Sequence, residues 1–319
     1  MSSSAKKTVL VDAVEGFALT KRDIAIIRAV QNHRLLRSRD HLVPLFGGSR
    51  HVQRRLQKLT EARFLYQLKR RPHEQAIYAI GNRGSDLMRE RFGVPRPKVD
   101  WGAQNKTLTE HHVEHTLLIS DILVRIELGC RARPGARFVD LTEIIERHAS
   151  NRVKKKARSV GGKPIRWRVA VRSGEWQGDA YIEPDGMFGI EEAGKTSWFF
   201  LEADRASMSV IPDNPCLDRS SIFKKMLQYW TSWSFKDVGG DNLIKQSFGM
   251  ADVRTLFVLS TEARGNIRLE RCLLANRYFQ SGKGTGLFLF VKRETLLEAT
   301  DILTAPLTSG TGKKKTLAG

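Results

Sequence analysis

The first eighty residues contain three stretches in which apolar side chains recur every three or four positions. This spacing predicts three helices, which begin near Thr20, Ser38 and Ser49. Each of these hydroxyl side chains can accept a hydrogen bond from an unpaired backbone N–H group of the first turn, and Asp23 adds a negative charge near the positive end of the first helix. The glycines at 47–48 predict a tight turn between the second and third helices.

The pattern then changes to alternation, which predicts two strands joined by a basic tip. Phe64, Tyr66 and Leu68 lie on one face of the first strand, and the second strand begins at Ile77. The tip consists of Lys69, Arg70, Arg71, Pro72 and His73. Two helices, a glycine turn, a third helix and a hairpin follow the order of a winged helix-turn-helix, which binds duplex DNA.

Polar and basic residues occupy the outer face of the predicted third helix. Their side chains can donate hydrogen bonds to phosphates and base edges, and their spacing puts them on one side. The residues expected to contact DNA there are Ser49, Arg50, Gln53, Arg54, Gln57 and Lys58. The alternative is a small helical domain with a solvated basic face. The basic tip of the hairpin favours the DNA-binding interpretation.

The charge of the whole chain also indicates an anionic partner. The sequence has 54 Lys and Arg against 34 Asp and Glu, which gives a formal net charge of +20. Contacts between basic side chains and phosphates release counterions, so double-stranded DNA is the expected partner. No apolar run approaches the roughly 20 residues that span a bilayer, and the three cysteines are scattered. We therefore expect a cytoplasmic, DNA-associated protein with no membrane partner.

Two prolines at 94–97 break the helical pattern and end the first predicted domain. A long helical stretch follows, with its apolar side chains on one side. The predicted organisation is a flexible basic N-terminus (1–15), a winged helix-turn-helix (16–95), a connecting helix (96–135), an α/β domain (136–300) and a disordered basic tail (301–319).

His111 and His115 begin that helical stretch, in a string that fits the inverted zinc-protease signature His-x-x-Glu-His. Two histidines four residues apart can share a helix face and a metal ion. A protease also needs a downstream glutamate, for which Glu191 or Glu192 would have to serve, and a protease would leave the basic N-terminal module unexplained. We therefore expect no zinc at these histidines.

A second basic cluster spans 152–168 and contains glycines and a proline. This composition predicts a flexible loop between strands. The expected phosphate contacts come from Lys154, Lys155 and Lys156. A solvated loop without a ligand is the alternative, and the two interpretations are compatible.

In the second domain strands dominate, and three carboxylates lie within or at the ends of apolar runs. Asp185 lies in a strand region at 178–188, and an apolar strand over 196–204 ends with Glu202 and Asp204. Glu202 and Asp204 are two residues apart and therefore point to the same face. Buried carboxylates are costly unless they pair with a cation or bind a metal ion.

Short motifs around these carboxylates resemble the replication-relaxation family of plasmids and integrative elements. The motifs are Pro184-Asp185, the run Phe-Leu-Glu-Ala-Asp-Arg at 200–205, and Lys225 four residues before Tyr229. The winged helix agrees with this resemblance, which covers most of the chain. The resemblance implies a role in plasmid replication, DNA relaxation or mobilisation.

The second domain in turn resembles the PD-(D/E)xK nuclease core. There an Asp and a Glu hold Mg²⁺ and a Lys lies near the scissile phosphate, because the metal ion polarises the phosphoryl oxygen and activates water. The resemblance implies Mg²⁺ or Mn²⁺ at Asp185, Glu202 and Asp204, with Lys225 as a catalytic residue. Asp204 departs from the motif, which has Lys at that position. The alternative is a buried salt-bridge network of Glu202, Asp204, Arg205 and Lys225.

Together these patterns predict an α+β N-terminal winged helix-turn-helix, followed by an α/β restriction-endonuclease-like domain. Two functions stay open. One is a metal-dependent enzyme that nicks the DNA of a plasmid or integrative element. The other is a non-catalytic DNA-binding initiator, accessory factor or transcription regulator, and other replication or mobilisation proteins are expected partners of either.

Overall fold

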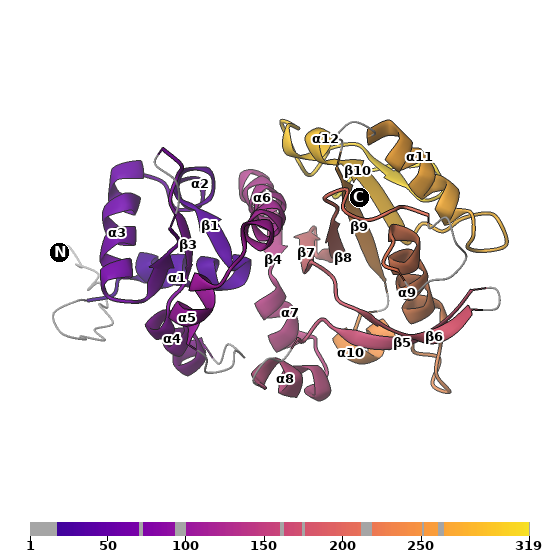
Figure 1. Cartoon of the computed structure of the whole chain (residues 1–319), viewed down its shortest axis with the longest axis horizontal. Coiled ribbons are helices and arrows are strands. Elements are labelled where there is room, and N and C mark those ends of the chain that lie inside the picture. The colour runs from indigo at the N-terminus through magenta and orange to yellow at the C-terminus, as the bar shows by residue number, and fades with distance from the viewer. Residues whose placement is uncertain are drawn as a thin grey trace, which may run out of the picture. The chain divides into compact units, whose positions relative to one another are not determined.

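The computed structural model describes residues 18–69, 73–92, 100–159, 163–173, 176–211, 219–250, 252–260 and 265–318 (Figure 1). The chain divides into two compact units, Met1–Ser120 and Asp121–Gly319. The division falls inside the long helix α6 (Glu110–Ala132), within the segment predicted to connect the domains. Both units contain helices and β-sheet, which confirms the mixed α and β class.

The first unit combines helices with a three-stranded antiparallel sheet of order β1-β3-β2. Its elements are α1 (Lys21–His33), β1 (Leu35–Arg37), a π-helix (Ser38–Leu42), α2 (Val43–Phe46), α3 (Ser49–Glu61), β2 (Leu65–Gln67), β3 (Ile77–Ile80), α4 (Asn82–Phe92), α5 (Trp101–Lys106) and the start of α6. The helices bury the apolar positions of their predicted periodic patterns, such as Ile27 on α1 and Leu56 on α3. This burial holds α1 and α3 in the unit.

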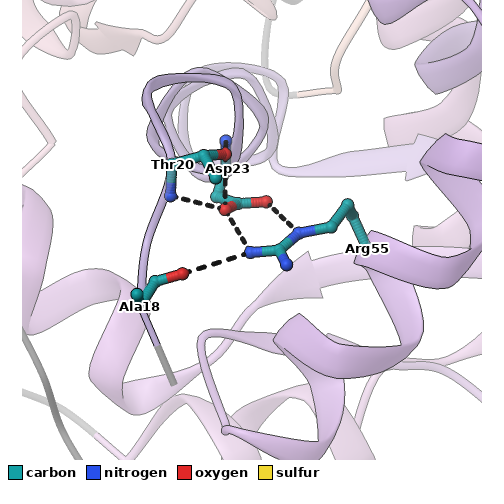
Figure 2. A network of polar contacts seen from close by, with 4 residues as sticks. All are labelled: Ala18, Thr20, Asp23 and Arg55. Carbon is teal, nitrogen blue, oxygen red and sulfur yellow. Dashed lines mark hydrogen bonds and ion pairs between the residues drawn. The ribbon is translucent and has the colours of Figure 1, made fainter. Parts of the chain in front are cut away.

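The N-terminus of α1 is joined to α3 by one buried carboxylate (Figure 2). Thr20 caps α1, as the sequence predicts, and Asp23 completes a reciprocal capping box. Arg55 of α3 donates from Nε to Asp23 Oδ1 at 2.7 Å, and its Nη2 also contacts Asp23 Oδ2. The same guanidinium reaches the carbonyl of Ala18 at 3.4 Å. Asp23 therefore helps to cap the N-terminus of α1 and also fixes the orientation of α3 against that helix.

Two details of this unit differ from the sequence prediction. The segment between the first two predicted helices contains strand β1, in which Leu35 and Leu36 are fully buried. Arg34 makes the turn with a positive φ of 68°. A three-residue strand is too short for alternation to appear in the sequence, so the periodic pattern missed it.

The second difference concerns the residues that cap two helices after β1. Ser38 begins a π-helix whose cap position is Arg37, and no side-chain cap is present there. The cap position of α3 is Gly48, not Ser49. Gly48 has a φ of 62°, in the left-handed region that glycine adopts without a steric cost.

The second unit is built on a seven-stranded sheet of order β12-β11-β10-β9-β8-β7-β4. Strands β5 and β6 form a separate hairpin. After α6, the elements of this unit in chain order are β4 (Ala136–Val139), α7 (Leu141–Arg147), α8 (Asn151–Arg158), β5 (Trp167–Ser173), β6 (Trp176–Ile182), β7 (Gly186–Glu192), β8 (Lys195–Ala203), α9 (Ile222–Ser234), α10 (Leu243–Phe248), β9 (Val253–Leu259), α11 (Gly265–Asn276), β10 (Phe288–Lys292), α12 (Arg293–Leu297), β11 (Leu307–Ser309) and β12 (Lys314–Lys315). Figure 1 shows this sheet with α9 and α11 beside it.

The pairing of neighbouring strands changes from antiparallel to parallel at β8, in the part of the sheet that holds the candidate site. Strands β4, β7 and β8 are antiparallel neighbours, whereas β8, β9 and β10 are parallel. Helix α9 lies in the connection from β8 to β9, and α11 in the connection from β9 to β10. The carboxyl ends of β8 and β9 therefore meet at one edge, where the polar residues after the apolar run of β8 are placed.

Two predictions for the second unit are wrong. The basic segment expected to be a loop begins with helix α8, in which Val153 and Ala157 are buried on one side. The C-terminal tail expected to be disordered supplies strands β11 and β12 of the main sheet. Leu307 and Leu317 are fully buried there, because the edge of the sheet needs apolar cover. Composition alone suggested a solvated tail and did not show where these two leucines pack.

Candidate functional site

Helix α3 carries an exposed basic face on one side and a buried apolar face on the other. Val52, Leu56 and Leu59 have no exposed surface. The exposed face consists of Arg50, Gln53, Arg54, Gln57 and Lys58. The structure therefore places these five predicted residues on one accessible surface. Ser49, the sixth residue predicted to contact DNA, is the first residue of α3, and its side chain lies outside the described residues.

The charges of this face are not neutralised. Asp23 pairs with Arg55, which points toward α1. In the part of the chain that the structure describes, Arg50, Arg54 and Lys58 have no acidic partner, and Gln57 donates to Glu61 at 2.9 Å. Three cations on two turns of helix therefore remain available to an external anion.

The β2–β3 hairpin follows α3 directly and is antiparallel, with Tyr66 opposite Ala79. Lys69, two residues after β2, is exposed. Arg70 and Arg71, the predicted basic tip, lie outside the described residues.

In the second unit, Glu202 of β8 is buried and held by two side chains of α9. Its Oε1 accepts a hydrogen bond of 2.7 Å from the Tyr229 hydroxyl, and its Oε2 accepts one from the Lys225 ammonium. Lys225 and Tyr229 are four residues apart on α9 and therefore share one helix face. The carboxylate is only 3% exposed, so water does not compete with these contacts.

Burial dominates the protonation of this group. Removal from water raises the pKa of Glu202, the nearby negative charge of Asp185 raises it further, and Lys225 and Tyr229 lower it, with a result of about 7. Burial lowers the pKa of Lys225, but the negative charges of Glu202 and Asp185 more than offset this, and the pKa is raised. Glu202 therefore changes charge near neutral pH while Lys225 stays charged.

Asp185 lies next to this pair, directly before β7, the strand that neighbours β8. Its Oδ2 accepts a hydrogen bond of 2.8 Å from the backbone N–H of Ala203, and its own N–H donates to the carbonyl of Leu201 at 3.0 Å. The structure thus brings Asp185, Glu202 and Lys225 together, as the sequence predicts for part of its candidate site.

Asp204 is engaged elsewhere, by an arginine that the sequence analysis missed. Arg268 of α11 binds both of its oxygens, with Nε–Oδ2 at 2.9 Å and Nη2–Oδ1 at 2.8 Å. The Ala206 N–H also donates to Oδ1 at 3.0 Å. The expected basic partners were Arg205 and Lys225. Arg268 lies 64 residues away in the chain, so no local pattern indicated the contact.

The three carboxylates do not fit a shared Mg²⁺ or Mn²⁺ in this arrangement. Both oxygens of Glu202 and both oxygens of Asp204 already accept hydrogen bonds from protein donors. Among the described residues, no three His, Cys, Asp or Glu side chains are placed to hold a metal ion. His111 and His115, on the first turns of α6, belong to no such group either. The absence of zinc at these histidines stays a prediction.

The predicted phosphate-binding lysines lie on helix α8. Lys155 is exposed and Lys154 is half-buried. The Lys156 ammonium donates to the carbonyl of Arg166, and burial, with the positive charges of Arg166 and Arg152, lowers its pKa. Lys156 therefore helps to fix the segment before β5 as well as adding charge.

A family model described as replication-relaxation matches residues 27–236, about two thirds of the chain. The chain belongs to the replication-relaxation family. This confirms the resemblance found in the sequence motifs, and the family description suggests a role in replication or DNA relaxation. Neither the curated proteins nor the solved structures gave a match.

The matched part of this replication-relaxation protein contains α3, Asp185, Glu202 and the whole of α9 with Lys225 and Tyr229. It ends before Arg268 and before the last strands of the sheet. The family match therefore covers the exposed basic helix and the Glu202–Lys225 pair, but not the residue that neutralises Asp204. Among the described helices of this chain, none has the length and apolarity that a membrane span requires.

Proposed function

We propose that this replication-relaxation protein binds double-stranded DNA through α3 and the β2–β3 hairpin. The observation that carries the proposal is the exposed face of α3, where Arg50, Arg54 and Lys58 have no acidic partner among the described residues. An α-helix fits the major groove, where Arg and Gln donate to base edges and Lys binds phosphates. The hairpin with Lys69 then follows the adjacent backbone.

The order of elements in the first unit supports this proposal. Helix α1, strand β1, the π-helix with α2, helix α3 and the hairpin follow one another, and the sheet order is β1-β3-β2. This order agrees with the proposed winged helix-turn-helix, in which the helix before the hairpin reads the groove. The family description, which names replication and relaxation, agrees with DNA as the ligand.

The test compares two variants that lose the same charge. Arg50, Arg54 and Lys58 are changed together to Ala in one variant, and the exposed Lys313, Lys314 and Lys315 are changed to Ala in the other. In a gel-shift titration at fixed salt, we expect the α3 variant to lose at least tenfold in duplex affinity and the control to bind nearly as the wild type. Equal binding by all three proteins would remove α3 from the proposal.

We further propose that the protein acts on plasmid or integrative-element DNA as a binding factor that does not cut it. The contacts to Glu202 and Asp204 support this, because Lys225, Tyr229 and Arg268 occupy their carboxylate oxygens. An initiator, mobilisation accessory factor or regulator needs only the binding activity.

Metal-dependent nicking is the second candidate, and one specific observation favours it. Asp185, Glu202 and Lys225 lie close together, and an Asp, a Glu and a Lys are the residue types that the resemblance to the PD-(D/E)xK core implies. Incubation of supercoiled plasmid with the protein, with and without Mg²⁺ or Mn²⁺, separates the two candidates. We expect no nicked product. Metal-dependent nicking that Glu202→Gln abolishes and the change Glu298→Gln, at an exposed position outside both sites, preserves would favour the enzyme.

A further inference from the structure

A cavity of about 360 Å³ lies in the second unit, lined by residues of α8, the β5–β6 hairpin and α10. Its apolar lining includes Val153, Trp167 and Phe248. Among the described residues, four basic side chains line it as well, namely Arg152, Lys156, Arg166 and Arg168, and no Asp or Glu does. Its volume is in the range of small-ligand sites, roughly 300–1,000 Å³. The cavity therefore offers an apolar interior together with a positive charge.

The basic residues of this cavity differ in how much they are already engaged. The Lys156 ammonium donates to the Arg166 carbonyl, Arg168 pairs with Asp179, and the Arg166 guanidinium lies 4.0 Å from Glu183. Arg152 is exposed and has no partner in the described part of the chain. Arg152 is therefore the side chain best placed to bind an external phosphate.

An exposed aromatic ring completes the site. Tyr181 of β6 lines the cavity and is 59% exposed, so its ring is accessible to a ligand. The Arg166 guanidinium lies over this ring, 4.6 Å from its centre. Tyr181 is directly opposite Arg168 in the antiparallel pair, so the two side chains lie on the same face of the hairpin. A flat ring flanked by arginines is a surface on which a nucleobase can stack.

We propose that this cavity binds an unpaired nucleotide of single-stranded DNA, with the base on Tyr181 and the phosphate at Arg152. Duplex DNA does not fit this site as well, because its bases are stacked and paired and only its backbone faces outward. The inference depends on the proposed function only in taking DNA as the ligand, and it uses none of the α3 residues. Trp167 lines the cavity and also packs against Tyr229, so the site borders the Glu202 cluster.

The test measures fluorescence anisotropy of a short labelled oligothymidylate with the full-length protein. We expect Tyr181→Ala and Arg152→Ala each to weaken binding by about tenfold, which is typical for loss of one base-stacking or phosphate contact. Tyr181→Phe keeps the ring and is the matched control, with binding close to the wild type. Both side chains are exposed, so circular dichroism of the three variants is expected to show an unchanged fold. The same variants are expected to keep full affinity for duplex DNA.

Two results would overturn this inference. One is an oligothymidylate affinity that neither Tyr181→Ala nor Arg152→Ala changes. The other is displacement of the oligothymidylate by thymidine monophosphate at a comparable concentration, since the ligand would then be a free nucleotide. The triple α3 variant separates this inference from the proposed function. If that variant keeps its duplex affinity while Tyr181→Ala loses the oligothymidylate, the proposed function fails and this inference stands.

Discussion

Glu202 and Arg54 are both ionisable side chains, yet only Glu202 is removed from water. Glu202 has a raised pKa and is satisfied by Lys225 and Tyr229. Arg54 is exposed, and no partner is found for it in the described residues. At the residue scale, burial therefore separates ionisable groups that are engaged inside the fold from charges that are available to a ligand.

The stability of the protein is expected to fall between about pH 4.5 and pH 7 because of Glu202. Its pKa is about 7 in the folded chain, against the ordinary value of 4.5, so in this interval the folded state holds a proton that the unfolded state has lost. Raising the pH therefore favours unfolding. Glu202→Gln removes this titration, so the wild type should lose roughly 1–3 kcal/mol relative to the variant between pH 5 and pH 8. Denaturant unfolding at the two pH values measures this, and an equal change in both proteins would contradict it.

The Asp204–Arg268 pair is expected to show strong coupling. Its side chains are only 4% and 13% exposed, so Arg268→Gln leaves a buried carboxylate without its cation. We expect this change to cost about 3 kcal/mol of unfolding free energy, and the additional change Asp204→Asn to recover part of that loss. A double-mutant cycle by denaturant unfolding measures the coupling. Additive effects of the two changes would show that the pair contributes nothing to stability.

At the scale of elements, position along α3 decides the role of each arginine. Arg55 is one residue after Arg54, but the helical rotation turns it toward α1 and Asp23. The same helix thus uses one arginine to orient itself and presents its other cations to the outside. The orientation of the exposed face depends on this inner contact, together with the buried Val52, Leu56 and Leu59.

Asp23→Ala is expected to destabilise the first unit by about 3 kcal/mol, because it removes both a capping box and the partner of Arg55. Asp86→Ala is the matched control. Asp86 pairs with Arg89 on α4 but is 39% exposed, so its loss is expected to cost less than about 1 kcal/mol. Denaturant unfolding of both variants checks the difference. Similar costs for the two changes would mean that the Asp23 network does not hold α3 in place.

At the scale of the whole molecule, the net charge of +20 predicts strong dependence of DNA binding on salt. A large excess of Lys and Arg over Asp and Glu attracts any polyanion, so the net charge by itself does not locate the DNA contact surface. The proposal that the exposed cations of α3 form this surface requires them to account for a defined part of the salt dependence.

We expect the slope of log affinity against log salt concentration to be shallower by about 2–3 in the Arg50, Arg54, Lys58 triple Ala variant than in the wild type. The reason is that each lost phosphate contact removes about 0.9 from the slope. The control with Ala at Lys313, Lys314 and Lys315 loses the same charge and should keep the wild-type slope. Equal slopes for both variants would indicate that net charge matters and that α3 makes no specific contact.

The sequence by itself determined the elements whose patterns are local. The periodicity of α1 and α3, the cap at Thr20, the exposed basic face of α3 and the β2–β3 hairpin were all predicted, because each depends on residues a few positions apart. The motifs around Asp185, Glu202 and Lys225 also led to the family that the match confirms. The DNA-binding and metal-binding roles of these residues stay predictions.

Only the tertiary structure decided which groups meet across long stretches of chain. Arg268 neutralises Asp204, the leucines at 307 and 317 bury the tail that composition predicted to be disordered, and Tyr181 joins Arg152 around one cavity. None of these contacts leaves a periodic signal, because the partners are brought together by strand order and helix packing. A local sequence pattern records which face of an element is apolar, whereas the choice of partner for a buried charge depends on the whole fold.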